Sequence, residues 1–146
     1  MQTPNSNISQ NKKIKLDFKN SKYATGRRKK SIAKVWIKKG SGNIHVNGLK
    51  MNEYFKRPVH QIIVTRPLEI TEVFSNYDVK CSVKGGGLSG QAGAIILGIS
   101  KALIAHDEKL KKNLKKDKLT TRDSRVVERK KYGHRKARRS FQFSKR

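Results

Sequence analysis

The apolar residues of this 146-residue chain are unevenly distributed, and their distribution limits what the chain can fold into. Almost all of them lie between Tyr23 and Leu110, whereas both flanking segments are polar and rich in lysine. Only the middle segment can bury enough apolar surface to fold by itself. We therefore expect a polar extension over residues 1–22, one globular body over residues 23–110, and a linker with a basic tail over residues 111–146.

Charge sets the second limit. Thirty-six Lys and Arg residues stand against ten Asp and Glu residues, which gives a formal charge of +26. A compact body with this charge repels itself unless a polyanion neutralises it. No apolar run approaches the roughly 18 residues that a membrane span needs, and no stretch pairs a broad apolar face with a basic one. The composition favours nucleic acid as the partner and argues against a membrane.

Residues that could carry chemistry are few and scattered. Cys81 is the single cysteine, so no intrachain disulfide is possible, and no Cys/His cluster has the spacing of zinc ligands. The four histidines lie in different segments, and the spacing indicates no carboxylate pair or Ser/His/Asp set. We therefore expect a protein that is not an enzyme and binds no metal, cofactor or small-molecule substrate.

Residue periodicity predicts several elements in the first half of the body. Residues 31–38 alternate between apolar and polar side chains, as in a half-buried strand. A turn at 40–43 should return the chain into a short strand at 44–46, forming a hairpin, and Asn47-Gly48 supplies another turn. Residues 51–55 fit one helical turn.

The next segment is ambiguous between strand and helix. Residues 62–64 are β-branched and suit a strand, whereas the apolar residues between 68 and 73 can line a helix. We favour helix for the part after Pro67. Residues 77–83 alternate again, which predicts a strand that places Cys81 in the core.

The clearest amphipathic helix is predicted from an N-cap at Ser89 to about Asp107, because apolar residues recur there at helical spacing. It should pack on the sheet. A lysine-rich connection over residues 109–118 follows, and then a short helix over about 122–131. The elements together indicate an α+β fold with an extended basic C-terminal tail.

A glycine-rich turn precedes this helix. Residues 85–90 match G-x-G-x-x-G, the pattern of a dinucleotide-binding turn. Such a unit needs a parallel strand with a terminal acid after the helix, but a lysine run follows Asp107, so we do not expect nucleotide binding. An RNA phosphate could bind the backbone N–H groups at the helix start instead, and a purely steric turn explains the glycines equally well. The candidate phosphate ligands are Lys84, Gly86, Gly87, Ser89 and Gln91.

A basic segment leads into the first predicted strand. Residues 27–30 place four cations on an extended backbone, where arginine can make forked contacts and lysine point contacts to phosphates. A solvated charged face is the alternative, but the high net charge favours RNA contact. The candidate ligands are Arg27, Arg28, Lys29 and Lys30.

The tail carries the strongest signal. Residues 129–146 contain nine cations and no acid, interleaved with Tyr132, His134, Phe141 and Phe143. Aromatic rings can stack on bases, and a segment of this composition does not fold alone. A generic basic tail of the histone kind is the alternative. The candidate RNA ligands of the tail are Arg129, Lys130, Lys131, Arg135, Lys136, Arg138, Arg139, Lys145 and Arg146.

Eight motifs follow one another along the chain. They are TGRRK at 25–29, VNG at 46–48, YF at 54–55, RPLE at 66–69, VKGGGLSGQAGAI at 83–95, TRDSR at 121–125, VERKKYG at 127–133 and QFSKR at 142–146. In this order they closely resemble the bacterial-type ninth protein of the small ribosomal subunit. The resemblance covers the chain from about Tyr23 to Arg146.

The resemblance implies a two-layer α+β body with helices on one face of a sheet and a left-handed crossover. It places this body in the rRNA of the subunit head, beside neighbouring head proteins. It implies that Lys145 and Arg146 reach the backbone of the anticodon stem-loop of peptidyl-site tRNA. Arg122, Arg125 and the cations of residues 129–139 would then bind rRNA.

Three departures from the family pattern limit what the resemblance predicts. Residues 1–22 precede the usual start of the family, so their role is not implied. Ser140-Phe141 stands where a proline is common, which leaves the path of the tail open. Residues 118–121 replace a more usual glycine-containing approach, which leaves the linker geometry open.

Composition also bears on the compartment. Twenty-five lysines against eleven arginines, with abundant Asn and Ile, suit an AT-rich genome, and the QFSKR ending resembles bacterial or organellar members. We expect a mitochondrial ribosome, with a chloroplast or bacterial one as the alternative. An autonomous nucleic-acid chaperone or DNA-packaging protein is the alternative function.

Overall fold

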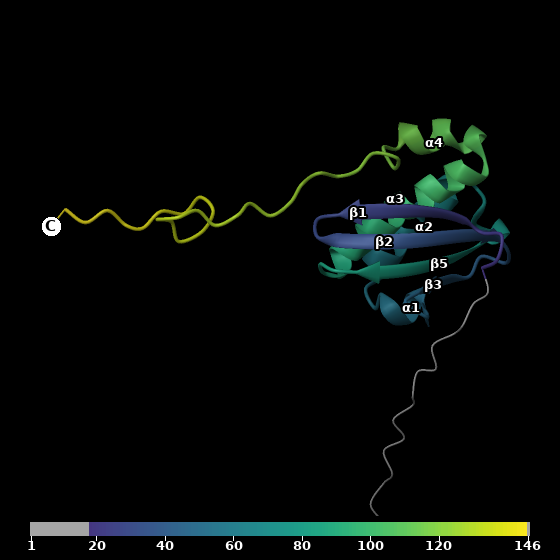
Figure 1. Ribbon diagram of the computed structural model, residues 1–146, viewed down its shortest axis with the longest axis horizontal. Helices are drawn as coiled ribbons and strands as arrows, with labels where there is room; N and C mark the ends of the chain where they lie inside the picture. Colours follow the sequence, from purple (N-terminus) through teal and green to yellow (C-terminus); the bar gives the residue numbers. More distant parts are fainter. Residues whose placement is uncertain (1–17, 146) are drawn as a thin grey trace, which may run out of the picture.

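The computed structural model describes residues 18–145 (Figure 1). Its five-stranded sheet has the order β1-β2-β5-β3-β4, with helices behind it, so the body is α+β as predicted. The strands are β1 (Lys22–Arg28), β2 (Ser31–Lys39), β3 (Ile44–Val46), β4 (Leu49–Lys50) and β5 (Tyr77–Lys84). The helices are α1 (Met51–Tyr54), α2 (Pro58–Ile70), α3 (Leu88–His106) and α4 (Lys111–Lys116), with 3-10 turns η1 (Phe74–Asn76) and η2 (Glu108–Leu110).

Side chains alternate between the two faces of the sheet in β2 and β5, and those on one face form the core. This alternation confirms the predicted strands. Ala33, Val35 and Ile37 of β2 are fully buried, and the side chains between them point to the other face. Cys81 lies in the same core from β5, and burial raises the pKa of its thiol. Cys81 is therefore a neutral core side chain, as expected.

The long helix α3 covers this apolar face. Its Ile95, Ile99 and Leu103 are fully buried in the core, at the four-residue spacing of one helix face. Val64 and Leu68 of α2 are also fully buried, and α2 packs against α3. Helices therefore cover one face of the sheet, and the other face looks towards the viewer in Figure 1.

Two expectations about α3 were wrong. Its N-cap is Gly87 rather than Ser89, and no side chain caps this end of the helix. We also expected no apolar run long enough to span a membrane, but α3 is long and apolar enough to do so by length and composition. However, 61% of its 18-residue apolar window is buried inside the body, as expected for the central helix of the core.

The predicted hairpin between residues 31–38 and 44–46 was wrong. Strand β2 pairs with β1 and β5, and β3 pairs in parallel with the far side of β5. Asp78 of β5 explains the path, because its carboxylate accepts hydrogen bonds from the N–H groups of Ser41 (3.0 Å) and Asn43 (2.9 Å). These bonds carry the turn across the end of β5. The turn at Asn47-Gly48 joins β3 to β4 as predicted.

The parallel pairing of β3 with β5 requires a crossover connection. The chain makes it through β4, α1 and α2 before it returns in β5. The one-turn helix expected near residues 51–55 is α1, so this prediction is confirmed. The left hand implied for the crossover stays a prediction.

Helix α2 shows where β-branched composition was misleading. The segment over residues 62–64 is helical, and the helix continues through Pro67 instead of beginning after it. Tertiary packing decides the outcome, because Val64 and Leu68 lie four residues apart on the face buried against α3. Pro58 occupies the first turn, where the missing N–H costs nothing.

The prediction of a short helix over about residues 122–131 was also wrong. Residues 122–131 form no regular structure, whereas the predicted connection contains α4. Leu114 of α4 is fully buried in the core. Val126 and Val127 are 62% and 86% exposed, so the expected helix has no apolar face to pack. Isolated helices of this length are not stable in water.

Gly26 allows the close approach of β1 to α3. A Cβ at this position would collide with the backbone oxygen of Ala94 and would lie 2.6 Å from the nitrogen of Gly98. Both obstacles are backbone atoms of α3, which cannot rotate away. The absence of a side chain at Gly26 therefore sets the distance between the sheet and its helix.

We predict that Gly26→Ala lowers the free energy of unfolding by about 1 to 3 kcal/mol or more, as expected for overpacking. Urea denaturation monitored by circular dichroism measures the change. Thr25→Ala, on the exposed face of the same strand, is the matched control and should leave the midpoint nearly unchanged. A Gly26→Ala midpoint equal to that of wild type would contradict this account.

Candidate nucleic-acid interface

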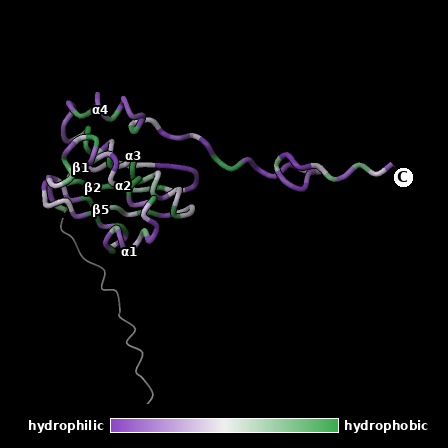
Figure 2. Tube along the Cα trace, turned by 180° about the vertical axis from the view of Figure 1, so that it is seen from behind, coloured by the Kyte–Doolittle hydropathy of each residue, from purple (hydrophilic) through white to green (hydrophobic). Residues whose placement is uncertain are grey.

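After the turns at residues 117–120, the chain leaves the body as an extended tail that is described to Lys145 (Figure 1). Figure 2 contrasts its largely hydrophilic trace with the hydrophobic segments inside the body. All the predicted RNA ligands of residues 129–139 are exposed in this tail. The tail is therefore an extended cationic segment outside the folded core.

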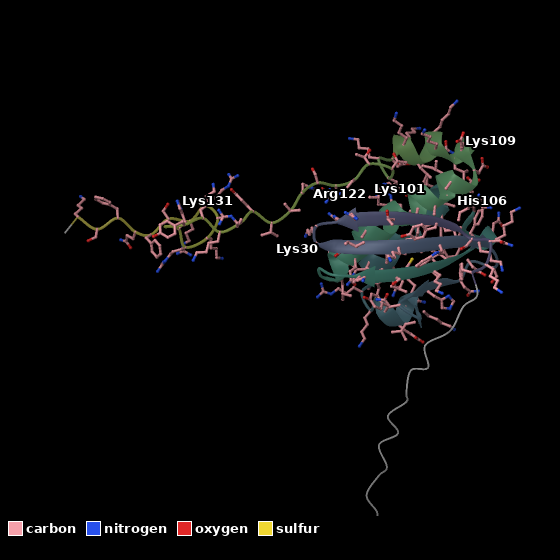
Figure 3. The ribbon with its side chains drawn as sticks, viewed as in Figure 1. Lys30, Lys101, His106, Lys109, Arg122 and Lys131 are labelled. Carbon is pink, nitrogen blue, oxygen red and sulfur yellow. The ribbon has the colours of Figure 1, made fainter. Side chains whose placement is uncertain are left out.

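Part of the tail forms a small loop, which carries Lys131 in Figure 3. The backbone N–H of Arg135 donates to the oxygen of Arg139 (2.8 Å), and His134 and Ser140 form an isolated bridge. Glu128 contacts Lys131 (3.3 Å) and Arg138 (2.9 Å). These pairs are exposed and weak, so a phosphate can replace the carboxylate without disturbing the core.

The aromatic residues of the tail are available for stacking. Tyr132 is fully exposed, Phe143 is 84% exposed and Phe141 is 61% exposed. The guanidinium of Arg135 lies over the ring of Phe141, 5.7 Å from its centroid. Exposed rings of this kind beside cations suit unpaired bases.

An ion-pair cluster fixes the root of the tail to the body. The carboxylate of Asp123 contacts Arg28 of β1 at 3.1 Å. Arg125 donates to both oxygens of the same carboxylate, from Nε at 3.0 Å and from Nη2 at 2.9 Å. The N–H of Arg125 adds a turn-forming bond at 3.0 Å. We call Arg28, Asp123 and Arg125 the root clip.

The root clip keeps Asp123 ionised. Hydrogen bonds from the side chain and backbone of Arg125 hold the pKa of this carboxyl well below its usual range, and the charge of Arg28 lowers it further. Asp123 in turn raises the pKa of Arg125. The clip is therefore fully charged at neutral pH, and it sets the direction in which the tail leaves the body.

Arg28 has a role in the body that was not predicted, because its side chain packs on α3, while its contact with RNA stays a prediction. It crosses Gly93 of α3, and its Nε is buried without a hydrogen-bond partner. It lines a groove of about 240 Å³. The other cations of this groove are Arg66 and Lys118; Arg27 also borders it, but strand alternation directs its side chain to the opposite face of the sheet. The resulting cluster could accept a phosphate beside the tail root.

The glycine-rich turn is held by bonds of its own. Gly85 and Gly86 have φ values of 76° and 62°, which favour glycine. Ser31 donates to the oxygen of Gly85 (2.9 Å). Gln91 donates to the same oxygen (3.3 Å) and accepts a bond from Tyr54 (2.7 Å). The Gln91 amide therefore stabilises the turn. This favours the steric explanation of the glycine-rich turn over a direct contact between Gln91 and RNA.

The start of α3 nevertheless faces a basic hollow of about 400 Å³. The first N–H groups of a helix lack intrahelical partners and carry partial positive charge. Gly87 and Ser89 lie at this end, with Lys29 of the β1–β2 turn and Arg57 and His60 nearby. Residues from three segments thus place positive charge around one helix start.

The other predicted ligands occupy different places. Lys30 lies on the β1–β2 turn and Arg122 between the body and the tail (Figure 3). Arg27 and Lys84 point from strand ends to the face opposite α3. Lys145 is exposed at the end of the described tail. Arg146 and residues 1–17 lie outside the described residues.

Sequence reasoning missed several cations that the fold brings to these sites. Arg57 stands at the start of α2, and Arg66 lies on the same helix near the groove. Arg66 lies in the segment that was read partly as a strand, and Arg57 precedes that segment. The RPLE motif that contains Arg66 was the available signal.

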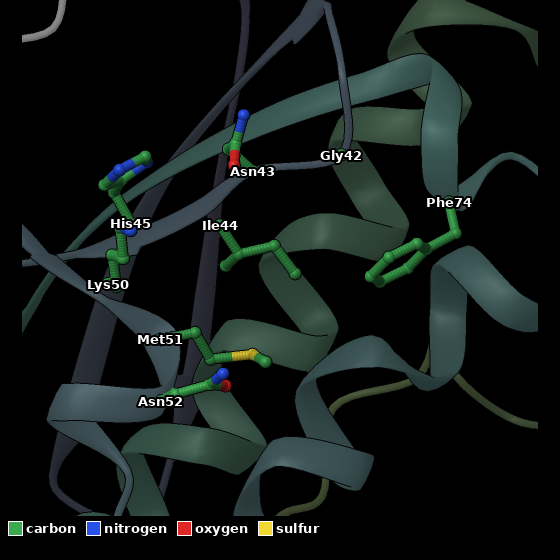
Figure 4. A pocket seen from close by; sticks show the side chains of 8 residues that line it. All are labelled: Gly42, Asn43, Ile44, His45, Lys50, Met51, Asn52 and Phe74. Carbon is green, nitrogen blue, oxygen red and sulfur yellow. The ribbon is translucent and has the colours of Figure 1, made fainter.

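Another hollow of about 190 Å³ lies beside β3 and α1 (Figure 4). The side chains of Ile44, Met51 and Phe74 line it, with Lys50 and His45 at one side. Its volume is below the roughly 300 to 1,000 Å³ of typical small-molecule sites. It gives no reason to assign a substrate pocket.

The chain matches the model of the family described as Ribosomal protein S9/S16 over residues 26–146. The chain belongs to this family. The matched segment includes the end of β1, the other four strands, α3, the root clip and the tail. This S9 family member is thus a structural protein of the small ribosomal subunit that binds rRNA and has other ribosomal proteins as partners, in a family that is structural rather than enzymatic.

We predict that Asp123→Asn frees the tail root of this S9 family member. Amide order parameters of residues 121–126 should fall from about 0.85, typical of rigid backbone, towards less than about 0.6. Because the pKa of Asp123 is lowered, its contribution is present above the ordinary value of 3.8 and is lost as pH falls below it. The wild-type root should therefore stay ordered from pH 7 to pH 5.

Glu128→Gln is the matched control, since it removes an acid that contacts only tail cations among the described residues. It should leave the root ordered. Equal loss of order in both variants, or none in Asp123→Asn, would show that the root clip does not position the tail.

Proposed function

We propose that the tail of this S9 family member threads through rRNA of the subunit head and reaches peptidyl-site tRNA. Cations of residues 129–139 anchor the tail in rRNA, and Lys145 with Arg146 contacts the backbone of the anticodon stem-loop. The observation that carries the proposal is the exposed tail, with cations and rings, that leaves the body at the root clip.

Physical chemistry favours this role for the tail. Beyond the root clip, the described tail has no regular structure apart from its loop and is largely exposed, so its order must come from a partner. Arginine binds phosphates through a planar fork, whereas lysine offers a compact charge. Exposed rings add base stacking that a wholly basic tail lacks. A folded polyanion with unpaired bases offers phosphates to the cations and bases to the rings.

The body makes a second rRNA contact in this proposal. The start of α3 at Gly87 and Ser89, with Lys29 and Arg57, offers N–H groups and charges to one phosphate segment, and Lys30 follows Lys29 on the same turn. Arg122 and Arg125 extend the contact at the tail root, while Arg28 acts mainly through Asp123. Neighbouring head proteins complete the surroundings of the body.

We propose a mitochondrial ribosome as the compartment, with a chloroplast or bacterial ribosome as the alternative. The excess of lysine over arginine, 25 to 11, supports an AT-rich genome. Fractionation of the source cells, followed by detection of the protein in purified organellar small subunits, tests this assignment. Recovery with cytosolic ribosomes alone would contradict it.

The rRNA role of the tail predicts a salt dependence. Replacing Arg135, Lys136, Arg138 and Arg139 by serine should reduce the slope of log K against log salt by roughly 3, if each cation meets one phosphate. Filter binding of the full chain to small-subunit rRNA at several salt concentrations measures the slope.

A matched variant removes the same charge from the exposed lysines of the η2 and α4 region. The substituted residues are Lys109, Lys111, Lys112 and Lys115. It should change the slope much less than the tail variant does. Equal changes of the slope in both variants would mean that the tail contributes only non-specific charge. That result would contradict the anchoring role.

The tRNA role predicts a separable effect. Deleting Lys145 and Arg146 should leave subunit assembly intact and weaken tRNA retention in the peptidyl site by about 2- to 30-fold, for two exposed ion contacts of ~0.2–1 kcal/mol each. Toeprinting or filter binding on purified subunits measures retention. The double variant Lys145→Arg and Arg146→Lys keeps both charges and should bind nearly as wild type. Unchanged affinity after the deletion would contradict the tRNA contact.

A further inference from the structure

The face of the sheet opposite α3 carries an aromatic and basic surface that the tail and the start of α3 do not use. Strand pairing places Tyr23, Trp36, Lys80 and His45 in one row across β1, β2, β5 and β3, because directly paired residues share a face. No element within residues 18–145 packs on this face, since the helices contact the sheet from the other side. We call it the outer face.

Its aromatic rings lie side by side. The ring centroids of Tyr23 and Trp36 are 5.3 Å apart with an interplanar angle of 43°. Tyr23 is 48% exposed and Trp36 is half-buried. Phe18, just before β1, adds a third ring, and the Nζ of Lys80 lies 5.7 Å from its centroid and 5.9 Å from that of Trp36. Contiguous exposed apolar surface rimmed by polar residues is a mark of interaction sites.

The charge of the outer face is predominantly positive. Lys80 lies in the ring row, Lys34 in the next row, and Arg27 and Lys84 in the row after that. Asp78 lies at the end of β5, but its carboxylate is bound by the N–H groups of Ser41 and Asn43. The face therefore presents cations around rings, and its electrostatic complement is a polyanion with flat apolar groups.

We propose that the outer face binds unpaired nucleotides of RNA, with bases stacked on Trp36 and Tyr23 and phosphates at the flanking lysines. This inference rests on the proposed function, because it adds a third RNA contact to the same protein. A duplex does not fit, since its bases are already stacked on one another and the A-form major groove is too deep and narrow for side chains to read. RNA would then contact the body on both sides of the sheet.

The chain contains its own reporter for this contact. Trp36 is the single tryptophan, so its fluorescence reports on the outer face and not on the tail. The full chain is titrated with an unstructured RNA of about ten nucleotides, within the range of single-strand sites, and with a hairpin duplex of equal phosphate number. We expect quenching of Trp36 by the single strand and little by the duplex.

The tail contribution is removed with the variant that replaces Arg135, Lys136, Arg138 and Arg139 by serine. In this background, quenching by the single strand should persist at lower affinity. Affinity for the dye-labelled RNA, measured by anisotropy, should fall about 5- to 150-fold in Trp36→Leu, the range of one lost base stack. Trp36→Phe keeps a ring and an apolar side chain and should bind within about threefold of the parent.

Three results would overturn the inference. They are RNA binding by anisotropy without a change in Trp36 emission, equal quenching by duplex and single strand, and equal affinity of the Leu and Phe variants. Association with small subunits is scored separately by sedimentation. A chain that sediments with subunits but gives no quenching loses the outer-face contact alone, whereas a chain absent from subunits loses the proposed function.

Discussion

The burial of one sheet face beneath α3 is the interaction on which the other features of this protein depend. It fixes β1 against the helix at Gly26, where a Cβ would meet backbone atoms of α3. The same contact carries Arg28 across Gly93, from where it reaches Asp123 and holds the tail root. It also sets the start of α3 beside the cations of the β1–β2 turn. The core thus positions groups that themselves lie on the surface.

The distribution of charge follows from this arrangement. The ionisable residues of the described core are Cys81, whose thiol is neutral, and Tyr77, and the cations project from the outer face of the sheet, the turns, α4 and the tail. Few carboxylates oppose them, and Asp78 and Asp123 are occupied by hydrogen bonds within the protein. A protein with this surface is stable as part of a complex in which RNA supplies the missing negative charge.

Elements with strong periodicity were predictable from the sequence, while those fixed by distant contacts were not. The alternation in β2 and β5 and the apolar stripe of α3 identified the core, and the motifs identified the family. The strand β1 was missed because its turn at Lys29-Lys30 contains neither Gly nor Asn, although Lys29 has a φ of 50°. The helix expected near Arg122 failed because its two valines have nothing to pack against.

The candidate site was likewise predictable from the sequence only in part. The density of cations made the tail recognisable from composition, and the glycine turn was recognisable from its motif. The root clip was not, since it depends on Arg28 and Asp123 meeting through the fold. Gln91 was assigned to RNA, yet its amide holds the turn that precedes α3. The outer face required strand pairing to bring Tyr23 and Trp36 together.

Crosslinking of the assembled small subunit with bound peptidyl-site tRNA tests the central claim most directly. Ultraviolet crosslinks are mapped by mass spectrometry to peptides of this protein and to nucleotides. The account predicts rRNA crosslinks from residues 129–139 and tRNA crosslinks from the segment that contains Lys145. Tail peptides that crosslink to neither RNA, while the body does, would contradict it.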